Sequence, residues 1–151
     1  MLKSLAKFIP EKASLPWMLK KRVLPQHTDH AGVMWHGSYI GWLEEARVET
    51  LAIVGLDYNE LTAIGFEIPV VSLTIKYKDY LRHGDEVLLE NFALKQDGVR
   101  WLWKTNFLGD GLKLFAEAKV ELVVVRKIDE DYRIVRELPD FLQEAIDKIN
   151  L

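Results

Sequence analysis

Cysteine is absent from the 151-residue chain, and its absence removes several classes of site. Disulfides, zinc–thiolate centres and cysteine nucleophiles are all excluded. The sequence also lacks an apolar run of the roughly 20 residues that a membrane-spanning helix needs. Neither sign of charge is in large excess, since the formal net charge is −3. We therefore expect neither a nucleic-acid surface nor a polybasic membrane surface, and a reducing, cytoplasmic location fits the missing cysteine.

The remaining composition is that of an ordinary globular domain. Hydrophobic residues make up 49% of the chain and charged residues 28%, and domains cluster at about 100–150 residues. We therefore predict one domain over residues 1–151. Residues 1–16 carry lysines among apolar residues and are interrupted by Pro10 and Pro16. We interpret them as a short lead-in, because a secretory signal needs an unbroken apolar centre.

Apolar spacing predicts one long helix in the first half of the chain. Residues 17–24 have the composition of a strand, whereas residues 38–54 repeat apolar side chains every three or four positions. We place Ser38 as the N-cap of this helix and Gly55 as the residue that ends it. A short second helix is predicted over 57–64.

Strand patterns dominate the second half of the chain. β-Branched, aromatic and other apolar residues mark four strand segments, 66–80, 87–95, 99–107 and 112–124. Tight turns such as Asp97-Gly98 make neighbouring strands antiparallel, and residues 138–150 are expected to form a C-terminal helix. One long helix cannot cover both faces of the sheet, so the sheet must curl around the helix or pair with another copy. The predicted fold class is α+β.

Residues able to carry chemistry concentrate just before the long helix, between Gln26 and Tyr39. This stretch contains Asp29 and three histidines, His27, His30 and His36. Carboxylate and imidazole are common general acid/base groups, and a helix start offers free N–H donors to an anion. The alternative is a polar loop that caps a core helix. A zinc site from the histidines is a further alternative, but their spacing matches no common helix-borne pair, and we predict no metal.

Sequence motifs narrow these alternatives. The first block reads Asp29-His30-Ala31-Gly32-Val33-Met34-Trp35-His36-Gly37-Ser38-Tyr39, followed by Trp42-Leu43-Glu44-Glu45-Ala46-Arg47. The second comprises Ile68-Pro69-Val70-Val71-Ser72 and Gly84-Asp85-Glu86-Val87. Over residues 18–128 the chain resembles the 4-hydroxybenzoyl-CoA thioesterase-like acyl-CoA thioesterases. The resemblance implies a hot-dog fold, an antiparallel sheet wrapped around one long central helix.

The resemblance also implies a catalytic arrangement. In this family the aspartate drives hydrolysis, the helix N-terminus helps to polarise the thioester carbonyl, and CoA lies along a subunit interface. Asp29 would attack the carbonyl directly or deprotonate a water. A carboxylate with an ordinary pKa of about 3.9 is a weak base at neutral pH, which favours direct attack. Backbone amides near Gly32 or at the helix start would stabilise the developing oxyanion.

Other residues are assigned to positioning and binding. His36 is expected to orient the thioester or a water, the alternative being a histidine hydrogen-bonded at the helix start. Three side chains are expected to line the acyl pocket, with packing as the alternative: Trp35, Tyr39 and Ser72. Three cations near strand ends are candidates for the CoA phosphates, with plain surface charge as the alternative: Arg82, Arg126 and Lys127. No cofactor is expected, because CoA is part of the substrate.

The sequence therefore predicts an acyl-CoA thioesterase for aromatic or short to medium aliphatic acyl groups, working as a homodimer or homotetramer. Two alternatives remain open: a hot-dog dehydratase or isomerase acting on acyl thioesters, and a non-catalytic acyl-CoA-binding module. Two positions depart from the family pattern. His27 stands where many relatives carry a second acid, which bears on the local pKa. Tyr80 stands where many have a proline, which bears on the pocket wall.

Overall fold

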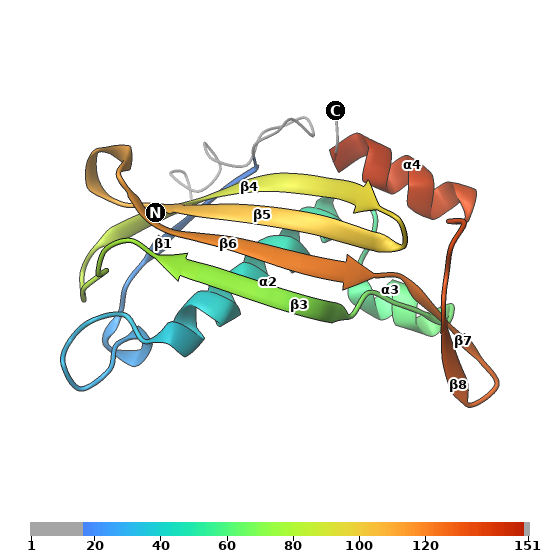
Figure 1. Cartoon of the computed structure of the whole chain (residues 1–151), viewed down its shortest axis with the longest axis horizontal. Helices are drawn as coiled ribbons and strands as arrows, with labels where there is room; N and C mark the ends of the chain where they lie inside the picture. The colour runs from blue at the N-terminus through green and yellow to red at the C-terminus, as the bar shows by residue number, and fades with distance from the viewer. Residues whose placement is uncertain (1–16, 150–151) are drawn as a thin grey trace.

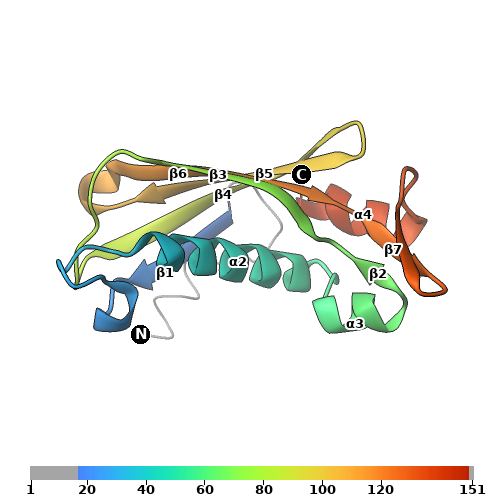
Figure 2. The same ribbon diagram turned by 60° about the horizontal axis from the view of Figure 1, so that its bottom comes forward.

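A five-stranded antiparallel sheet in the order β1-β4-β5-β6-β3 is the main feature of the computed structural model, which describes residues 17–149, apart from the side chains of residues 93–95. The long helix α2 (His36–Ile53) lies along one face of the sheet (Figures 1 and 2). The strands are β1 (Trp17–Arg22), β3 (Val70–Tyr77), β4 (Glu86–Asp97), β5 (Arg100–Leu108) and β6 (Leu114–Val123). This arrangement confirms the predicted α+β fold. The predicted lead-in, 1–16, lies outside the described residues.

Alternation along the central strands determines which face meets α2. On β5, Trp101, Trp103 and Phe107 are buried while the residues between them are more exposed, as the sequence predicts. On β6, the small side chains of Ala116 and Ala118 are buried on the same face and lie beside the larger β5 residues. Small residues on one strand beside large residues on its neighbour give a densely packed layer under the helix.

Helix α2 begins three residues earlier than the sequence predicts, since the predicted N-cap is Ser38. Its N-cap is Trp35, which makes no side-chain capping hydrogen bond, and the first helical residue is His36. Ser38 is not the cap, because its hydroxyl donates to the carbonyl of His27 at 3.0 Å. The predicted end is confirmed, since Gly55 follows the helix with φ +91°. The helix buries Leu43 and other residues of its sheet-facing side.

The segment predicted as one strand over 66–80 is split in two. Helix α3 (Tyr58–Ala63) precedes it, and its N-cap Asp57 accepts from the amides of Asn59 and Glu60. A short strand, β2 (Phe66–Glu67), then pairs with a different sheet from β3. Pro69 lies in the break, where it has no N–H to donate and its carbonyl accepts from Val123 at 3.2 Å. Elsewhere in the chain, two 3₁₀ turns follow β1 and β5: η1 (Pro25–His27) and η2 (Asp110–Leu112).

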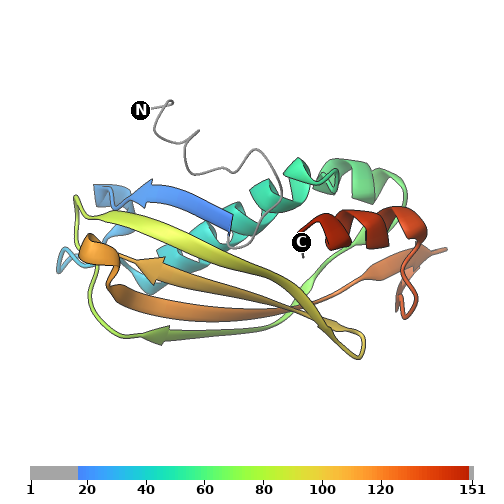
Figure 3. The same ribbon diagram turned by 90° about the horizontal axis from the view of Figure 1, so that it is seen from above.

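A β-hairpin that the sequence did not predict follows β6. Strands β7 (Val125–Ile128) and β8 (Asp131–Ile134) pair antiparallel and form a three-stranded sheet with β2. Helix α4 (Asp140–Ile149) follows Pro139, two residues later than its predicted start, and buries Leu142, Ala145, Ile146 and Ile149. The hairpin, α3 and α4 lie together at one end of the molecule (Figures 2 and 3). Among the described residues, no helix is long and apolar enough to cross a membrane.

The β3 edge of the sheet is incompletely covered. Leu73 and Tyr77 pair with the inward-facing Val120 and Ala116 of β6, so both point toward the helix side. They are nevertheless 37% and 50% exposed. Ile40 on α2 is also exposed. Apolar side chains on the helix side are thus exposed beside β3.

Candidate active site

Asp29 lies in a tight turn just before α2. Its amide donates to the carbonyl of Val33 at 2.9 Å, and the amide of Gly32 donates to the carbonyl of Asp29 at 3.1 Å. Gly32 has φ +82°, a conformation that glycine adopts without steric cost. One carboxylate oxygen of Asp29, Oδ1, accepts from the amide of Ala31 at 2.8 Å. Within the described residues the second oxygen has no hydrogen bond, so the carboxylate is oriented yet keeps an oxygen for chemistry.

Neighbouring backbone fixes this turn against the helix and the β3–β4 loop. The amide of Trp35 donates to the carbonyl of His27 at 2.9 Å, and that of Met34 donates to the carbonyl of Leu81 at 2.7 Å. Val33 forms a bridge with Arg82 in the same loop. The contacts with Leu81 and Arg82 tie the turn to a loop that is distant in the chain, and the Trp35–His27 bond closes it locally. Together they position Asp29 relative to the start of α2.

The start of α2 is open. An α-helix leaves its first N–H groups without intrahelical acceptors, and here Trp35 supplies no side-chain cap and the first turn has no acidic residue. The amide of Ser38 is used by the carbonyl of Trp35, which leaves those of His36 and Gly37 as the candidate donors. Because the Gly32 amide closes the Asp29 turn, the helix start is the better of the two oxyanion sites that the sequence suggests.

Gly37 has a role that the sequence analysis missed. The Trp35 indole lies against it, so that an added Cβ would be 2.8 Å from the ring atom Cε3 and closer still to Cζ3 and Cη2. Such distances are too short for ordinary van der Waals contact. The only sequence signal is a glycine in the first turn of a helix, where a side chain would normally be favourable.

The three histidines are not brought together. His36 is the first residue of α2 rather than a loop residue, and its exposed ring lies 4.9 Å from the ring of Trp35. His27 turns toward the core, where its Nδ1 accepts from the amide of Leu24 and its ring meets Trp42 edge-on. Burial and then the charge of Lys21 lower the pKa of His27, against an opposing effect of Glu45. Among the described side chains, no group of three or more His, Asp or Glu is arranged to hold a metal ion.

The Tyr39 side chain is buried between α2 and the sheet. It is 2% exposed and makes edge-on ring contacts with Tyr77 at 5.0 Å and Phe107 at 5.1 Å. Burial raises its pKa to about 12, with a smaller contribution from Tyr77. Trp35 differs, because its side chain is largely open to solvent. Of the two aromatics predicted to line a pocket, Trp35 is the exposed one.

The remaining predicted site residues lie at different distances from Asp29. Arg82 is beside it, through the bridge to Val33. Ser72 pairs with Glu121, which alternates with buried β6 residues, so Ser72 points away from α2. Arg126 and Lys127 are exposed on β7, at the opposite end of the molecule (Figure 2). Within one protomer, only Arg82 among the proposed CoA contacts is close to the Asp29 turn.

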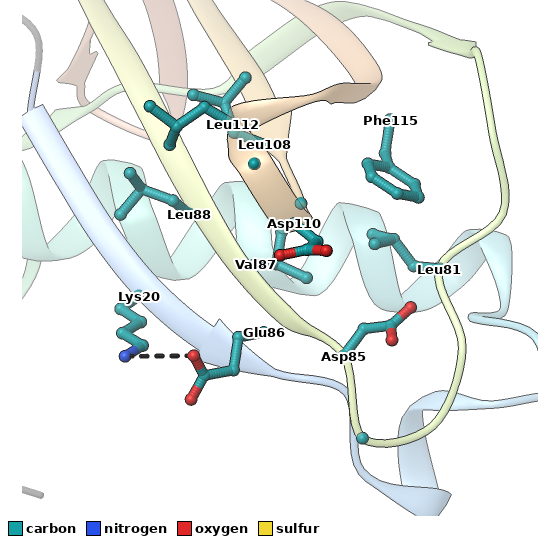
Figure 4. A pocket seen from close by; sticks show the side chains of 13 residues that line it. Lys20, Leu81, Asp85, Glu86, Val87, Leu88, Leu108, Asp110, Leu112 and Phe115 are labelled. Atoms are coloured by element: carbon teal, nitrogen blue, oxygen red, sulfur yellow. Dashed lines mark ion pairs between the residues drawn. The ribbon is translucent and has the colours of Figure 1, made fainter.

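A cavity of about 590 Å³ lies at the end of the sheet between β4 and η2 (Figure 4). Asp29 does not line it. Two of its carboxylates already have partners, because Asp85 accepts from the amide of Arg82 at 2.8 Å and Glu86 pairs with Lys20 at 3.4 Å. A hydrogen bond from Arg22, and then Lys20, lower the pKa of Glu86. We therefore assign the candidate chemistry to the Asp29 turn and not to this cavity.

Comparison with known proteins identifies the family of this chain. The Thioesterase-like superfamily matches residues 23–146. A Synechocystis sp. protein named "Putative esterase sll0410" is 36% identical over 130 residues, which cover 85% of this chain and 76% of that protein. The structure of a DHNA-CoA thioesterase from Staphylococcus aureus is 25% identical, with a TM-score of 0.75 over 87% of this chain and 89% of that chain.

A more distant likeness shows the same fold with a ligand. The structure of a 4-hydroxybenzoyl-CoA thioesterase mutant complexed with 4-hydroxybenzoyl-CoA is 17% identical, with a TM-score of 0.75. It covers 87% of this chain and 99% of that chain. The match over residues 23–146, the sheet wrapped around α2 and the aspartate turn before it lead to one assignment: this chain is a hot-dog protein of the thioesterase-like superfamily, a thioester hydrolase by family.

Proposed function

We propose that the protein hydrolyses acyl-CoA thioesters to the free acid and CoA, with Asp29 as the reacting carboxylate. The observation that carries the proposal is the placement of Asp29. One of its oxygens is held by the Ala31 amide, while the other is left without a hydrogen bond among the described residues. This carboxylate sits in the turn that leads directly into the uncapped start of α2.

The chemistry has two routes that this placement supports. In the first, Asp29 attacks the thioester carbonyl carbon, the C–S bond breaks, and CoA leaves as a thiolate that takes a proton from solvent. Water then hydrolyses the mixed anhydride and restores the carboxylate. In the second, Asp29 takes a proton from a water that attacks the same carbon; the C–S bond then breaks, and the departing CoA thiolate takes the proton from Asp29, which restores the carboxylate. In both routes the amides of His36 and Gly37 would stabilise the oxyanion, and one such donor is worth about 3 kcal/mol.

His36 is a candidate for orienting the substrate. Its ring is exposed beside Trp35 at the helix start, and a neutral imidazole both donates and accepts a hydrogen bond. Trp35 offers a flat apolar surface next to the same turn, which suits an aromatic or a short to medium aliphatic acyl group. The aryl-CoA thioesters named for structural relatives support the aromatic part of this range.

We further propose a homodimer in which two β3 strands pair side by side. The free edge of β3 and the exposed Leu73, Tyr77 and Ile40 support this arrangement, because a second copy would extend both the sheet and the apolar layer. Two-fold pairing is antiparallel, so the β7 end of one copy would approach the Asp29 end of the other. That geometry keeps Arg126 and Lys127, together with Arg82, as candidates for the CoA phosphates.

Asp29→Asn tests the proposed function. Asn preserves the size of the side chain and an acceptor for the Ala31 amide, but it is neither a nucleophile nor a base. We expect turnover of a panel of aryl- and alkyl-CoA thioesters to fall by about 10³-fold or more, with folding and acyl-CoA binding retained. Product mass separates hydrolysis from dehydration or isomerisation. A wild-type kcat in the variant would refute a catalytic role for Asp29. If the wild type binds acyl-CoA without hydrolysing it, the proposed thioesterase activity is refuted.

A further inference from the structure

Among the residues that the structure describes, Arg47 is a buried cation without a charged partner. It lies on α2 and is 6% exposed, and its Nε donates to the hydroxyl of Tyr58 at 3.2 Å. Among the described residues, its two terminal nitrogens have no hydrogen-bond partner and the side chain forms no ion pair. A guanidinium carries five N–H donors in a planar fork, and buried charges in proteins are normally paired. The structure therefore leaves most of this donor set available to a ligand.

Arg47 lines a cavity of about 650 Å³. The cavity is bounded by α2, α3, β2, the start of β3 and the β7–β8 hairpin. Its walls are mainly apolar and aromatic: Tyr58, Ile68, Pro69, Val70, Val125 and Tyr132. This combination of apolar walls and one oriented polar group is typical of a small-molecule site.

Two carboxylates also line the cavity, and neither neutralises Arg47. Glu44 is exposed, and Glu67 accepts from the hydroxyl of Thr62 at 2.9 Å. No oxygen of either lies within 4.0 Å of the guanidinium, since they form no salt bridge with it. Their negative field disfavours a doubly charged phosphate more than a singly charged carboxylate. The planar guanidinium fork matches a carboxylate in two parallel hydrogen bonds.

We propose that this cavity recognises a carboxylate at the far end of the acyl group, so that the substrates include CoA thioesters of dicarboxylic acids. This inference rests on the proposed function and on the β3-paired dimer. Arg47 lies eleven residues after His36, or about 16 Å along the helix, which is too far to serve Asp29 of the same protomer in a short substrate. The second copy supplies the link between the two sites.

The direction of strand β3 explains how a second copy would link the Arg47 cavity to an Asp29 turn. Val70 at its start lines the Arg47 cavity, whereas Tyr77 at its end contacts Tyr39 near the start of α2. Antiparallel pairing of two β3 strands places the Val70 end of one copy opposite the Tyr77 end of the other. The cavity of one copy then borders the Asp29 turn of its partner. Arg47 would hold the distal carboxylate while the partner's turn attacks the thioester.

Matched substrates test the proposal. Adipyl-CoA and hexanoyl-CoA have acyl groups of equal carbon number that differ by a terminal carboxylate in place of a methyl group. Suberyl-CoA and octanoyl-CoA form the same pair with two more carbons. We expect the wild type to prefer the diacid in at least one pair by about 10- to 100-fold in kcat/KM, the range of a charge-assisted hydrogen-bonded pair. No preference in either pair would overturn the inference.

Substitutions attribute the preference to the cavity. Arg47→Met keeps the length of the side chain and removes the fork, and it should lower the diacid-to-monoacid ratio of kcat/KM by about 10- to 100-fold. Arg47→Lys keeps the charge but loses two-point binding, so the ratio should fall less. Arg100→Met is the matched control, because Arg100 is an exposed arginine that pairs with Glu121. If Arg47→Met does not fold, Tyr58→Phe should lower the same ratio by loosening the orientation of the fork.

The inference and the proposed function can fail separately. Hydrolysis of hexanoyl-CoA or an aryl-CoA with no diacid preference leaves the function intact and refutes the Arg47 site. If no thioester is hydrolysed, calorimetric binding of adipyl-CoA and hexanoyl-CoA to the wild type and to Arg47→Met still decides the site. Loss of the dimer in Arg47→Met, with an unchanged substrate ratio, would show that a second copy fills the cavity and would also refute the proposal.

Discussion

Gly37→Ala should impair catalysis while leaving stability almost unchanged. Alanine in place of glycine favours a helix by about 0.5–1 kcal/mol. The new methyl group would, however, collide with the Trp35 indole, whose Cε3 lies 2.8 Å from the Cβ position. The indole is 48% exposed and can swing aside at a cost of about 0.5–1.5 kcal/mol for an unfavourable rotamer. The two effects nearly cancel, so we expect the free energy of unfolding to change by less than about 1 kcal/mol.

Activity should respond more strongly, because the indole and the Gly37 amide both border the proposed oxyanion position. We expect kcat/KM to fall by about 10- to 100-fold, the scale of a misplaced orienting contact. Urea unfolding and steady-state hydrolysis of one acyl-CoA measure the two quantities. In a Trp35→Ala background the collision is removed, so Gly37→Ala should then stabilise the fold and leave kcat/KM unchanged. Full activity of Gly37→Ala in the wild-type background would refute this account of the helix start.

Three further predictions concern catalysis, assembly and pH. His36→Ala and His36→Gln should each lower kcat/KM by about 10- to 100-fold, or 1.4–2.7 kcal/mol in barrier, and full activity of both would make the histidine structural. Light scattering at micromolar concentration should give at least twice the 17.5 kDa of one chain; a monomer that hydrolyses acyl-CoA would contradict the shared site. Because burial raises the pKa of Tyr39 to about 12, its contribution to stability is complete below about pH 10 and is lost as the pH rises toward 12. Between about pH 10 and 12 the free energy of unfolding should therefore fall less steeply with pH in Tyr39→Phe than in the wild type. Equal slopes in the two proteins would show that Tyr39 does not titrate in this range.

The central sheet and its helix could be predicted from the sequence because their side chains alternate between two environments. Trp101, Trp103 and Phe107 fall on one face of β5 by sequence parity alone, and that face is buried. The β7–β8 hairpin has no such signal. All its residues except Val125 are exposed, so apolar and polar positions are not sorted into faces, and strand periodicity disappears.

The start of α2 could not be predicted because it departs from local helix-capping preference. Ser38 is a favourable N-cap residue, yet the cap is Trp35, and the Ser38 hydroxyl holds the His27 carbonyl instead. An uncapped helix start exposes donors that a stable fold would normally satisfy. Departures of this kind concentrate at functional sites, which agrees with the role proposed for the Asp29 turn.

The candidate site was only partly predictable for a different reason. Residue types and the resemblance to thioesterases identify Asp29, but they say nothing of distance across the fold. Ser72 and Asp29 are both part of recognisable motifs, and the sheet nevertheless turns Ser72 to the face opposite α2. The cavity that Arg47 lines is bounded by residues of α3 and of the unpredicted hairpin, so the motif that contains Arg47 does not reveal the cavity.

The two edges of the main sheet have different consequences for growth into larger aggregates. Pairing of β3 with β3 about a two-fold axis is self-complementary, so it closes after two copies and cannot propagate. Among the described strands, the opposite edge is β1, which carries Lys20, Lys21 and Arg22 in succession; each forms an ion pair with Glu86 or Glu45. Charged edge strands resist edge-to-edge addition. A dimer built in this way ends on two charged edges, which keeps a ten-stranded sheet from becoming the seed of a fibre.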